Sequence, residues 1–304
     1  MEMIRGTLYG NPCRWLLIAA VACMAASCSD DHKATVLETE SRGPVVMKTE
    51  SGSMTDVMAK GTTVGAFFMS RENGSVYRRN EMLIVGEHGM LMQERDTIVP
   101  LDLESYDFLA YSPYESSWDD LPDSVVEFEV RTDQSSDMDY VASDLMISNR
   151  MIETDDRIEA VFRHVMSKVV LHVTDKTGVF DMRFSSAVIK DIRNRSYLHV
   201  SGNTAKTDAS ASADLNLHML DARDRRASYA VVFPPQQLAD GKLIIEVEVA
   251  GIVYDFTVSG VPALEEGDVY VCSMSMTDRG LELDDTELTD WADGGSGIMI
   301  VAYE

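Results

Sequence analysis

Beyond its N-terminal segment, the chain is dominated by short stretches in which apolar and polar residues alternate. Period-two alternation, or a β-branched and aromatic run bounded by turn residues, is typical of a β-strand. Strands are predicted at residues 34–40, 44–49, 62–70, 81–86, 97–101, 106–112, 124–130, 159–173, 184–192, 229–234, 242–258, 268–276 and 297–303. Helical periodicity is scarce, and only residues 214–224 are expected to form a turn or two of helix. The pattern therefore predicts an all-β fold.

The clearest of these elements is a hairpin at residues 242–258. Apolar residues alternate with glutamates as far as Gly251, where the turn is expected, and alternation resumes from Ile252 to Val258. The longest run, 159–173, loses its alternation near Met166, which suggests a β-bulge. Frequent turn signals between short strands favour antiparallel sandwiches.

The pattern also suggests where the chain divides. Residues 148–160 are polar and charged and precede the longest strand pattern. We place a boundary near residue 155, between an N-terminal β-domain at 43–155 and a C-terminal β-domain at 156–304. A chain of 304 residues favours about two domains.

The N-terminus reads as an export signal, which we assign to residues 1–27. Arginines precede an apolar run that is too short to remain as a membrane-spanning helix. The following "AASC" resembles the lipobox of bacterial lipoproteins, which predicts lipidation of Cys28. "SDD" after it resembles the acidic tether of surface-exported lipoproteins and favours Cys28 over Cys23. Ordinary secretory cleavage after Ser27 is the alternative.

The net charge and the cysteine positions exclude one class of partner and one kind of covalent cross-link. The net charge of −25 disfavours nucleic acid, which requires a basic footprint on the protein. Two of the four cysteines lie in the signal, Cys28 follows directly at its end, and Cys272 alone lies in the body of the chain, so we expect no internal disulfide. Its alternating strand context predicts a small buried side chain.

No catalytic or metal-binding pattern emerges from the sequence. His164 stands in a strand without a recognisable set of catalytic partners, and we expect it to be a buried structural residue. The acidic loops do not match a calcium-binding spacing, and the histidines lack metal-ligand spacing. We therefore predict no enzyme activity, no metal and no cofactor. An alternative function is glycan binding by a surface lipoprotein, with Trp118, Tyr111 and Tyr114 as an exposed aromatic platform.

Several motifs along the chain, in their order, resemble the fimbrillin family of two-domain pilus subunits. The first are "KGTTVGAFFMS" and "YDFLAYSPY". The next are Asp133-Gln134-Ser135 and Ser143-Asp144-Leu145-Met146. The last are Phe162-x-His164-x-x-Ser167-Lys168, "VVFPPQQL" and Trp291, although "TDWADGG" is more acidic around the tryptophan than the family leads us to expect.

The resemblance implies two tandem transthyretin-like antiparallel β-sandwich domains. It also implies a lipid-anchored precursor at the outer membrane that becomes part of a cell-surface fimbrium. A trypsin-like protease would remove the first strand, and a donor strand from another subunit would fill the vacated groove. Implied partners are other pilus subunits, this protease and, for an adhesive role, a receptor on a host or bacterial surface.

These expectations can be placed on particular residues. Residues 28–42 form a lipidated arm with a candidate removable strand at 34–40. Arg42, followed by Gly43, is the predicted cleavage site, with Lys48 and Lys60 as alternatives. The predicted donor strand is 297–304, in which one face carries Ile298, Ile300 and Ala302. The alternative is that this strand completes its own domain.

Overall fold

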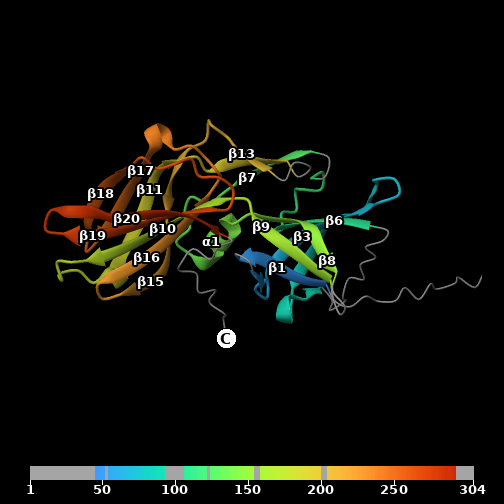
Figure 1. Cartoon of the computed structure of the whole chain (residues 1–304), viewed down its shortest axis with the longest axis horizontal. Coiled ribbons are helices and arrows are strands. Elements are labelled where there is room, and N and C mark those ends of the chain that lie inside the picture. The colour runs from blue at the N-terminus through green and yellow to red at the C-terminus, as the bar shows by residue number, and fades with distance from the viewer. Residues whose placement is uncertain are drawn as a thin grey trace, which may run out of the picture. The chain divides into compact units, whose positions relative to one another are not determined.

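The computed structural model describes residues 45–51, 54–92, 106–121, 124–153, 158–199 and 204–291. Nearly all of their regular structure is β, arranged in four sheets (Figure 1). The predicted all-β, antiparallel sandwich class is confirmed. The predicted strands at 34–40, 97–101 and 297–303 lie outside the described residues.

The first sheet has eight strands and takes most of its strands from the first half of the chain. Its spatial order is β2 (Met54–Val57), β1 (Val45–Ser51), β9 (Ile158–His164), β8 (Met146–Glu153), β6 (Tyr106–Ser112), β3 (Thr63–Ser70), β4 (Val76–Val85) and β5 (Leu91–Met92). All neighbours pair antiparallel except β1 and β9, which run parallel.

The other three sheets are built mainly from the second half. The five-stranded sheet contains β15 (His218–Arg223), β16 (Arg226–Phe233), β10 (Ser167–Asp175), β19 (Asp268–Thr277) and β20 (Gly280–Asp290). The four-stranded sheet contains β14 (Ala213–Asn216), β11 (Ser185–Ile192), β17 (Lys242–Val249) and β18 (Ile252–Ser259). The three-stranded sheet contains β13 (Thr204–Thr207), β12 (Arg195–His199) and β7 (Val125–Glu129).

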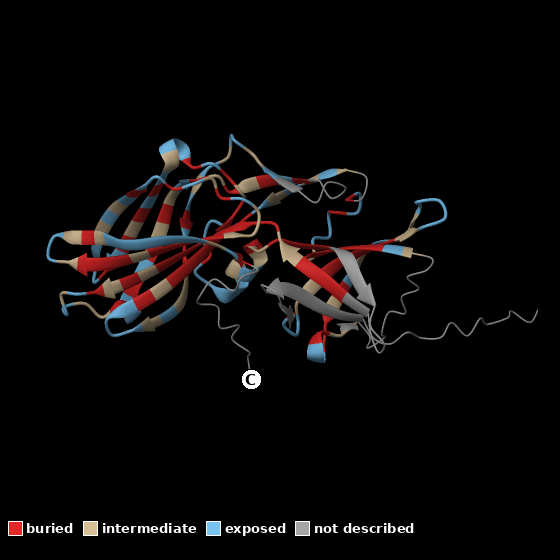
Figure 2. Cartoon of the chain, viewed as in Figure 1, coloured by how far each residue is buried: buried red, intermediate tan, exposed pale blue. Residues whose placement is uncertain are grey.

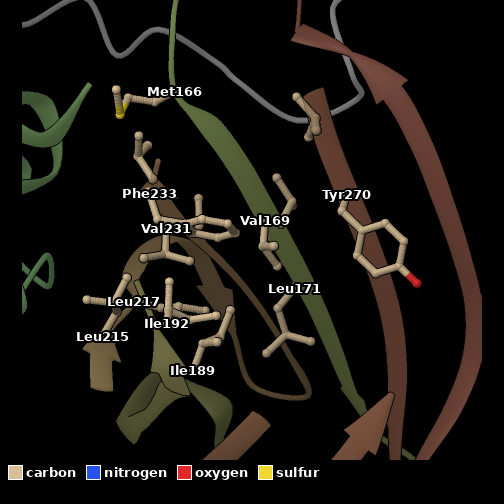
Figure 3. Close-up of a cluster of buried hydrophobic side chains, with 14 of the residues drawn as sticks. Met166, Val169, Leu171, Ile189, Ile192, Leu215, Leu217, Val231, Phe233 and Tyr270 are labelled. Atoms are coloured by element: carbon tan, nitrogen blue, oxygen red, sulfur yellow. The ribbon is translucent and has the colours of Figure 1, made fainter. Parts of the chain in front are cut away.

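A sandwich forms where the inner faces of the five- and four-stranded sheets meet. Val169 and Leu171 of β10 and Val231 of β16 lie in one buried cluster with Ile189 and Ile192 of β11 (Figure 3). All five side chains are essentially inaccessible to solvent. Buried and exposed or half-buried positions alternate along β17 (Figure 2), as a half-buried sheet requires.

The β17–β18 hairpin confirms the prediction for residues 242–258. Leu243, Ile245, Val247 and Val249 are buried, and Ala250 and Gly251 form the turn with φ of 54° and 76°. Two successive positive φ angles are the geometry that matches the twist of a tight hairpin.

Two other predictions need correction. Residues 214–224 are not helical: β14 and β15 occupy them, with a break at Leu217, whose N–H bonds the Ala187 carbonyl. Residues 159–173 form two strands in different sheets, because the chain bends at Val165 and Met166 as it passes from β9 to β10.

The single α-helix among the described residues, α1 (Asp137–Ser143), was not predicted. The side chain of Ser136 caps its first turn by accepting a bond from the Asp139 N–H. A helix of 7 residues spans too few turns for periodicity to be recognised.

The predicted domain boundary near residue 155 falls in a segment outside the described residues. Strand pairing crosses that position in both directions, because β9 joins the first sheet and β7 pairs with β12. The division into 43–155 and 156–304 remains a prediction.

Candidate functional site

Most of the predicted site residues lie outside the part of the chain that the structure describes. These are Cys28, Arg42, Ile298, Ile300 and Ala302. The alternative cleavage positions are described: Lys48 lies within β1, and Lys60 lies in the turn after β2. The candidate site is therefore built from the strands around these two lysines and from the end of β20.

Strands β1 and β2 form the edge of the eight-stranded sheet. β1 pairs in parallel with β9 from Val45 opposite Ile158 to Thr49 opposite Phe162, and β2 pairs with β1 alone. β1 also contacts β5 and the short 3₁₀ helix η1 (Glu87–Gly89), which belong to the opposite end of the strand order. The sheet therefore curls until its first strands approach its last one.

A separate hydrophobic core lies within this curled sheet. Phe68 and Phe108 form an edge-to-face pair with ring centroids 5.5 Å apart. Their cluster consists of Met58, Val64, Ala66, Phe68, Leu83, Val85, Phe108, Ala110, Met146, Ala160 and Phe162. Since Met58 directly follows β2, the N-terminal edge contributes to this core as well as to the strand ladder.

Lys60 lies in an exposed turn between the edge hairpin and β3. It forms an ion pair with Glu87, and the two side chains are 69% and 65% exposed. The N–H of Gly61 donates to the Val85 carbonyl at 2.7 Å. The side chain of Lys60 is thus accessible, whereas Lys48 belongs to a strand with neighbours on both sides.

A second feature gathers side chains from distant segments at the end of β20. The indole of Trp291 stacks on the His164 imidazole with ring centroids 3.9 Å apart and an interplanar angle of 4°. His164 Nδ1 lies 2.8 Å from Asp144 Oδ1, and Lys168 Nζ lies 3.9 Å from the Trp291 ring centroid. We call these four residues, Asp144, His164, Lys168 and Trp291, the tryptophan slot.

Lys168 is the unusual member of the tryptophan slot. The residue is 1% exposed, and its Nζ has no hydrogen-bond partner among the described residues. Burial lowers the pKa of the amine from 10.5 to about 7, and the charge of Asp144 opposes that decrease. The Lys168 ammonium lies over the face of the Trp291 indole, which attracts a cation electrostatically.

His164 thus occupies a structural position, between a carboxylate and an indole. Its neighbours do not form a nucleophile–base arrangement, and no group of metal-ligating side chains occurs among the described residues. Within the same residues, no helix has the length and apolar character to span a membrane. Cys272 is fully buried, as predicted, and burial raises its pKa to about 12.

Gln134, from the Asp133-Gln134-Ser135 motif, forms hydrogen bonds with the edge of β16. Its side-chain amide accepts from the Val232 N–H at 3.0 Å and donates to the Val232 carbonyl at 2.7 Å. β15 pairs with β16 only as far as Ala230, so the amide continues the ladder one step beyond the end of that strand. Gln134 is fully buried.

We expect Gln134→Ala to lower the free energy of unfolding by about 2–4 kcal/mol, because two buried backbone groups of Val232 lose their partners. Chemical denaturation measures the change. Ser135→Ala is the matched neighbour, since Ser135 is exposed, and it should cost less than about 0.5 kcal/mol. Equal losses in the two variants would contradict this role.

The predicted aromatic platform around Trp118 is wrong. Trp118 is 4% exposed and packs on Tyr111, with ring centroids 4.8 Å apart. Tyr111 is itself fully buried. These rings complete a hydrophobic core, and they are not available to stack on a sugar.

Comparison with known proteins shows which family the chain matches. The model of the fimbrillin-like family matches residues 49–291. A Bacteroides uniformis protein named as a candidate fimbrium subunit, Fim1C, is 24% identical over 300 residues, covering 92% of this chain and 95% of that protein.

Two crystal structures of candidate cell adhesion proteins share the fold. The one from Bacteroides uniformis has a TM-score of 0.60 and 17% identity, and covers 82% of this chain and 98% of that one. The one from Bacteroides ovatus has a TM-score of 0.62 and 15% identity, and covers 82% and 97%.

Proposed function

Because the chain belongs to the fimbrillin-like family, we propose that it is a fimbrial subunit assembled by protease-triggered strand exchange. The observation that carries this proposal is the edge hairpin β1–β2. It is attached to its sheet through the β1–β9 ladder. It is followed by Met58, which lies in a hydrophobic core, and by the exposed Lys60.

Removal of this hairpin would leave a binding site for another strand. β9 would lose the partner along one edge, and a cut after Lys60 would also remove Met58 from the core around Phe162 and Phe68. An unpaired strand edge beside apolar side chains is a template for strand addition. The backbone ladder would supply affinity, and alternate side chains of the donor would supply specificity.

Cleavage at the three candidate sites would affect strands β1 and β2 differently. Cleavage after Arg42 would leave β1 in place, because β1 begins at Val45. Cleavage after Lys48 requires a paired strand to open first. Cleavage after Lys60 would release both edge strands from an exposed turn. We propose that Arg42 is the site that frees the arm and that Lys60 is the site that opens the groove.

The donor in this proposal is the C-terminal segment 297–304. Ile298, Ile300 and Ala302 alternate with other apolar residues, as a strand that fills a groove requires. Deletion of 297–304 should leave a folded monomer that is unable to polymerise. Loss of folding would instead assign the strand to its own domain.

Export as a lipoprotein completes the proposal. Lipidation of Cys28 would hold the precursor at the outer membrane until the arm is cut, and the released subunit would enter the fimbrium. The glycan-binding alternative has lost its proposed platform, because Trp118 is buried. An adhesive tip role would add a receptor, whereas a shaft role requires both the groove and the donor strand.

Brief trypsin treatment tests the assembly mechanism directly. The purified protein from residue 28 onward should give a heat-resistant ladder on a denaturing gel after cleavage. Lys60→Ala should abolish the ladder, while Arg42→Ala should lose only the cut at residue 42. N-terminal sequencing of each band identifies the site that was used. A ladder in Lys60→Ala whose subunits begin at Gly43 would overturn the role of Lys60 and retain that of Arg42.

A further inference from the structure

The tryptophan slot joins three parts of the chain at one point. His164 is the last residue of β9 in the first sheet, and Lys168 lies at the start of β10 in the five-stranded sheet. Asp144 follows α1, and Trp291 follows β20. The slot therefore lies where the chain passes from one sheet to the other.

Backbone hydrogen bonds fix the same point. The Trp291 N–H donates to the Gly267 carbonyl at 2.6 Å, and the Gly267 N–H donates to the Met166 carbonyl at 3.0 Å. The hydroxyl of Ser167 donates to the Glu265 carbonyl at 2.7 Å. Trp291 is thus held by its main chain as well as by its ring, and it is only 8% exposed.

The attachment of Trp291 matters because of the residues that follow it in the sequence. The next residues are "ADGGSG", a composition typical of a flexible linker, and the predicted donor segment follows them. The predicted donor segment is therefore connected through this linker to Trp291, the residue that the tryptophan slot holds. A tether gives the highest effective concentration when its length matches the distance to be spanned.

We infer that Asp144, His164 and Lys168 position the donor segment by holding Trp291 at the junction of the two sheets. Trp291 is a positioning residue in this inference, which rests on the proposed strand exchange. Asp144 orients the imidazole, the imidazole and the Lys168 amine contact the indole, and the indole fixes the root of residues 292–304. Fixing that root reduces the conformational entropy lost when a donor strand is bound.

A solely structural tryptophan would affect folding and assembly together, so the test separates the two. Trp291→Ala removes the ring, and Trp291→Phe retains a ring that can stack on His164. Leu281→Ala is the matched control, because Leu281 is a buried residue at the opposite end of β20. Each full-length variant is compared for its unfolding midpoint, its rate of ladder formation after trypsin, and its rate of C-terminal trimming by carboxypeptidase.

We expect Trp291→Ala to form the ladder about tenfold more slowly, the factor that corresponds to one stacked aromatic contact of about 1.4 kcal/mol. Trp291→Phe should restore most of the rate. Leu281→Ala should lower the unfolding midpoint and leave the rate within about twofold of the unmodified protein, because it alters no contact at the root of the tether. Carboxypeptidase should trim further into the chain in Trp291→Ala alone.

The inference is overturned if Trp291→Ala forms the ladder and is trimmed as Leu281→Ala is. If the unmodified protein forms no ladder, strand exchange itself fails, and trimming then decides the role of the slot. Trimming that stops at the same residue in Trp291→Ala and in the unmodified protein overturns the slot. Trimming that proceeds further in Trp291→Ala supports it.

Discussion

Lys168→Met is expected to raise the free energy of unfolding by about 3 kcal/mol at pH 7, within the range observed when hydrophobic residues replace buried charges. The lysine is buried without a hydrogen-bond partner among the described residues. Burial lowers the pKa of the Lys168 amine from 10.5 to about 7. Folding must therefore either release the proton of this amine or bury its positive charge. Methionine has a similar length, carries no charge and makes favourable contacts with aromatic rings.

The same substitution should change how stability depends on pH. Between about pH 7 and 10.5, the unfolded chain holds a proton on Lys168 that the folded chain has released. Stability of the unmodified protein should therefore rise with pH across this window, because the unfolded state binds more protons. Lys168→Met lacks this contribution, so its advantage should shrink as the pH approaches 10.5.

Urea denaturation between pH 7 and pH 10 measures both effects. Lys242→Met is a suitable control, since that lysine is about half exposed and forms a surface ion pair with Asp240. It should change stability by less than about 1 kcal/mol at every pH. A loss of stability in Lys168→Met at pH 7 would show that the ammonium is stabilised by the slot more strongly than burial destabilises it.

Gly65→Ala is expected to destabilise the protein by about 3 kcal/mol or more, at the upper end of the cost of overpacking a core. A Cβ atom on Gly65 would lie 2.3 Å from Cε1 and Cζ of the buried Tyr111 ring. That ring cannot move away freely. Its hydroxyl lies 2.6 Å from Asn80 Oδ1 and 2.8 Å from the Glu115 carbonyl oxygen, and Trp118 packs against it.

A double-mutant cycle isolates the steric clash. In a Tyr111→Leu background the ring is absent, so Gly65→Ala should cost less than about 1 kcal/mol. Gly74→Ala provides a control at an open turn position with φ of 70°, where about 1–2 kcal/mol of backbone strain is expected. If Gly65→Ala costs the same with and without the tyrosine ring, the clash is not the cause.

The strand pattern predicted much of the fold because half-buried strands leave a direct mark on the sequence. The β17–β18 hairpin shows this, since buried aliphatic residues alternate with exposed or half-buried ones and a Gly marks the turn. Residues 214–224 were misread because two strands of 4 and 6 residues are too short to show a clear period. The switch of sheets at Val165 left only a slip in alternation, which did not reveal that the two strands separate.

The candidate site was less accessible to sequence reasoning. Asp144, His164 and Trp291 belong to motifs that the family resemblance singled out, but no spacing along the chain indicates that they touch. Their contact depends on the parallel pairing of β10 with β19 and on the turn at Gly267, which are properties of the whole sheet. Trp118 illustrates the converse error, because an aromatic residue in a polar stretch can still point into a core.

The short edge strand β2 has a consequence for how filaments would meet one another. In the structure, the 4-residue β2 is the outermost strand and pairs with Lys48–Ser51 of β1, so the outermost strand at this edge is short. Short edge strands are a common protection against unwanted pairing. A single donor strand in the place of β1 would have no β2 beside it. Under the proposed strand exchange, the predicted donor segment 297–304 would be a longer edge strand than β2, and neighbouring filaments would bundle laterally through these edges.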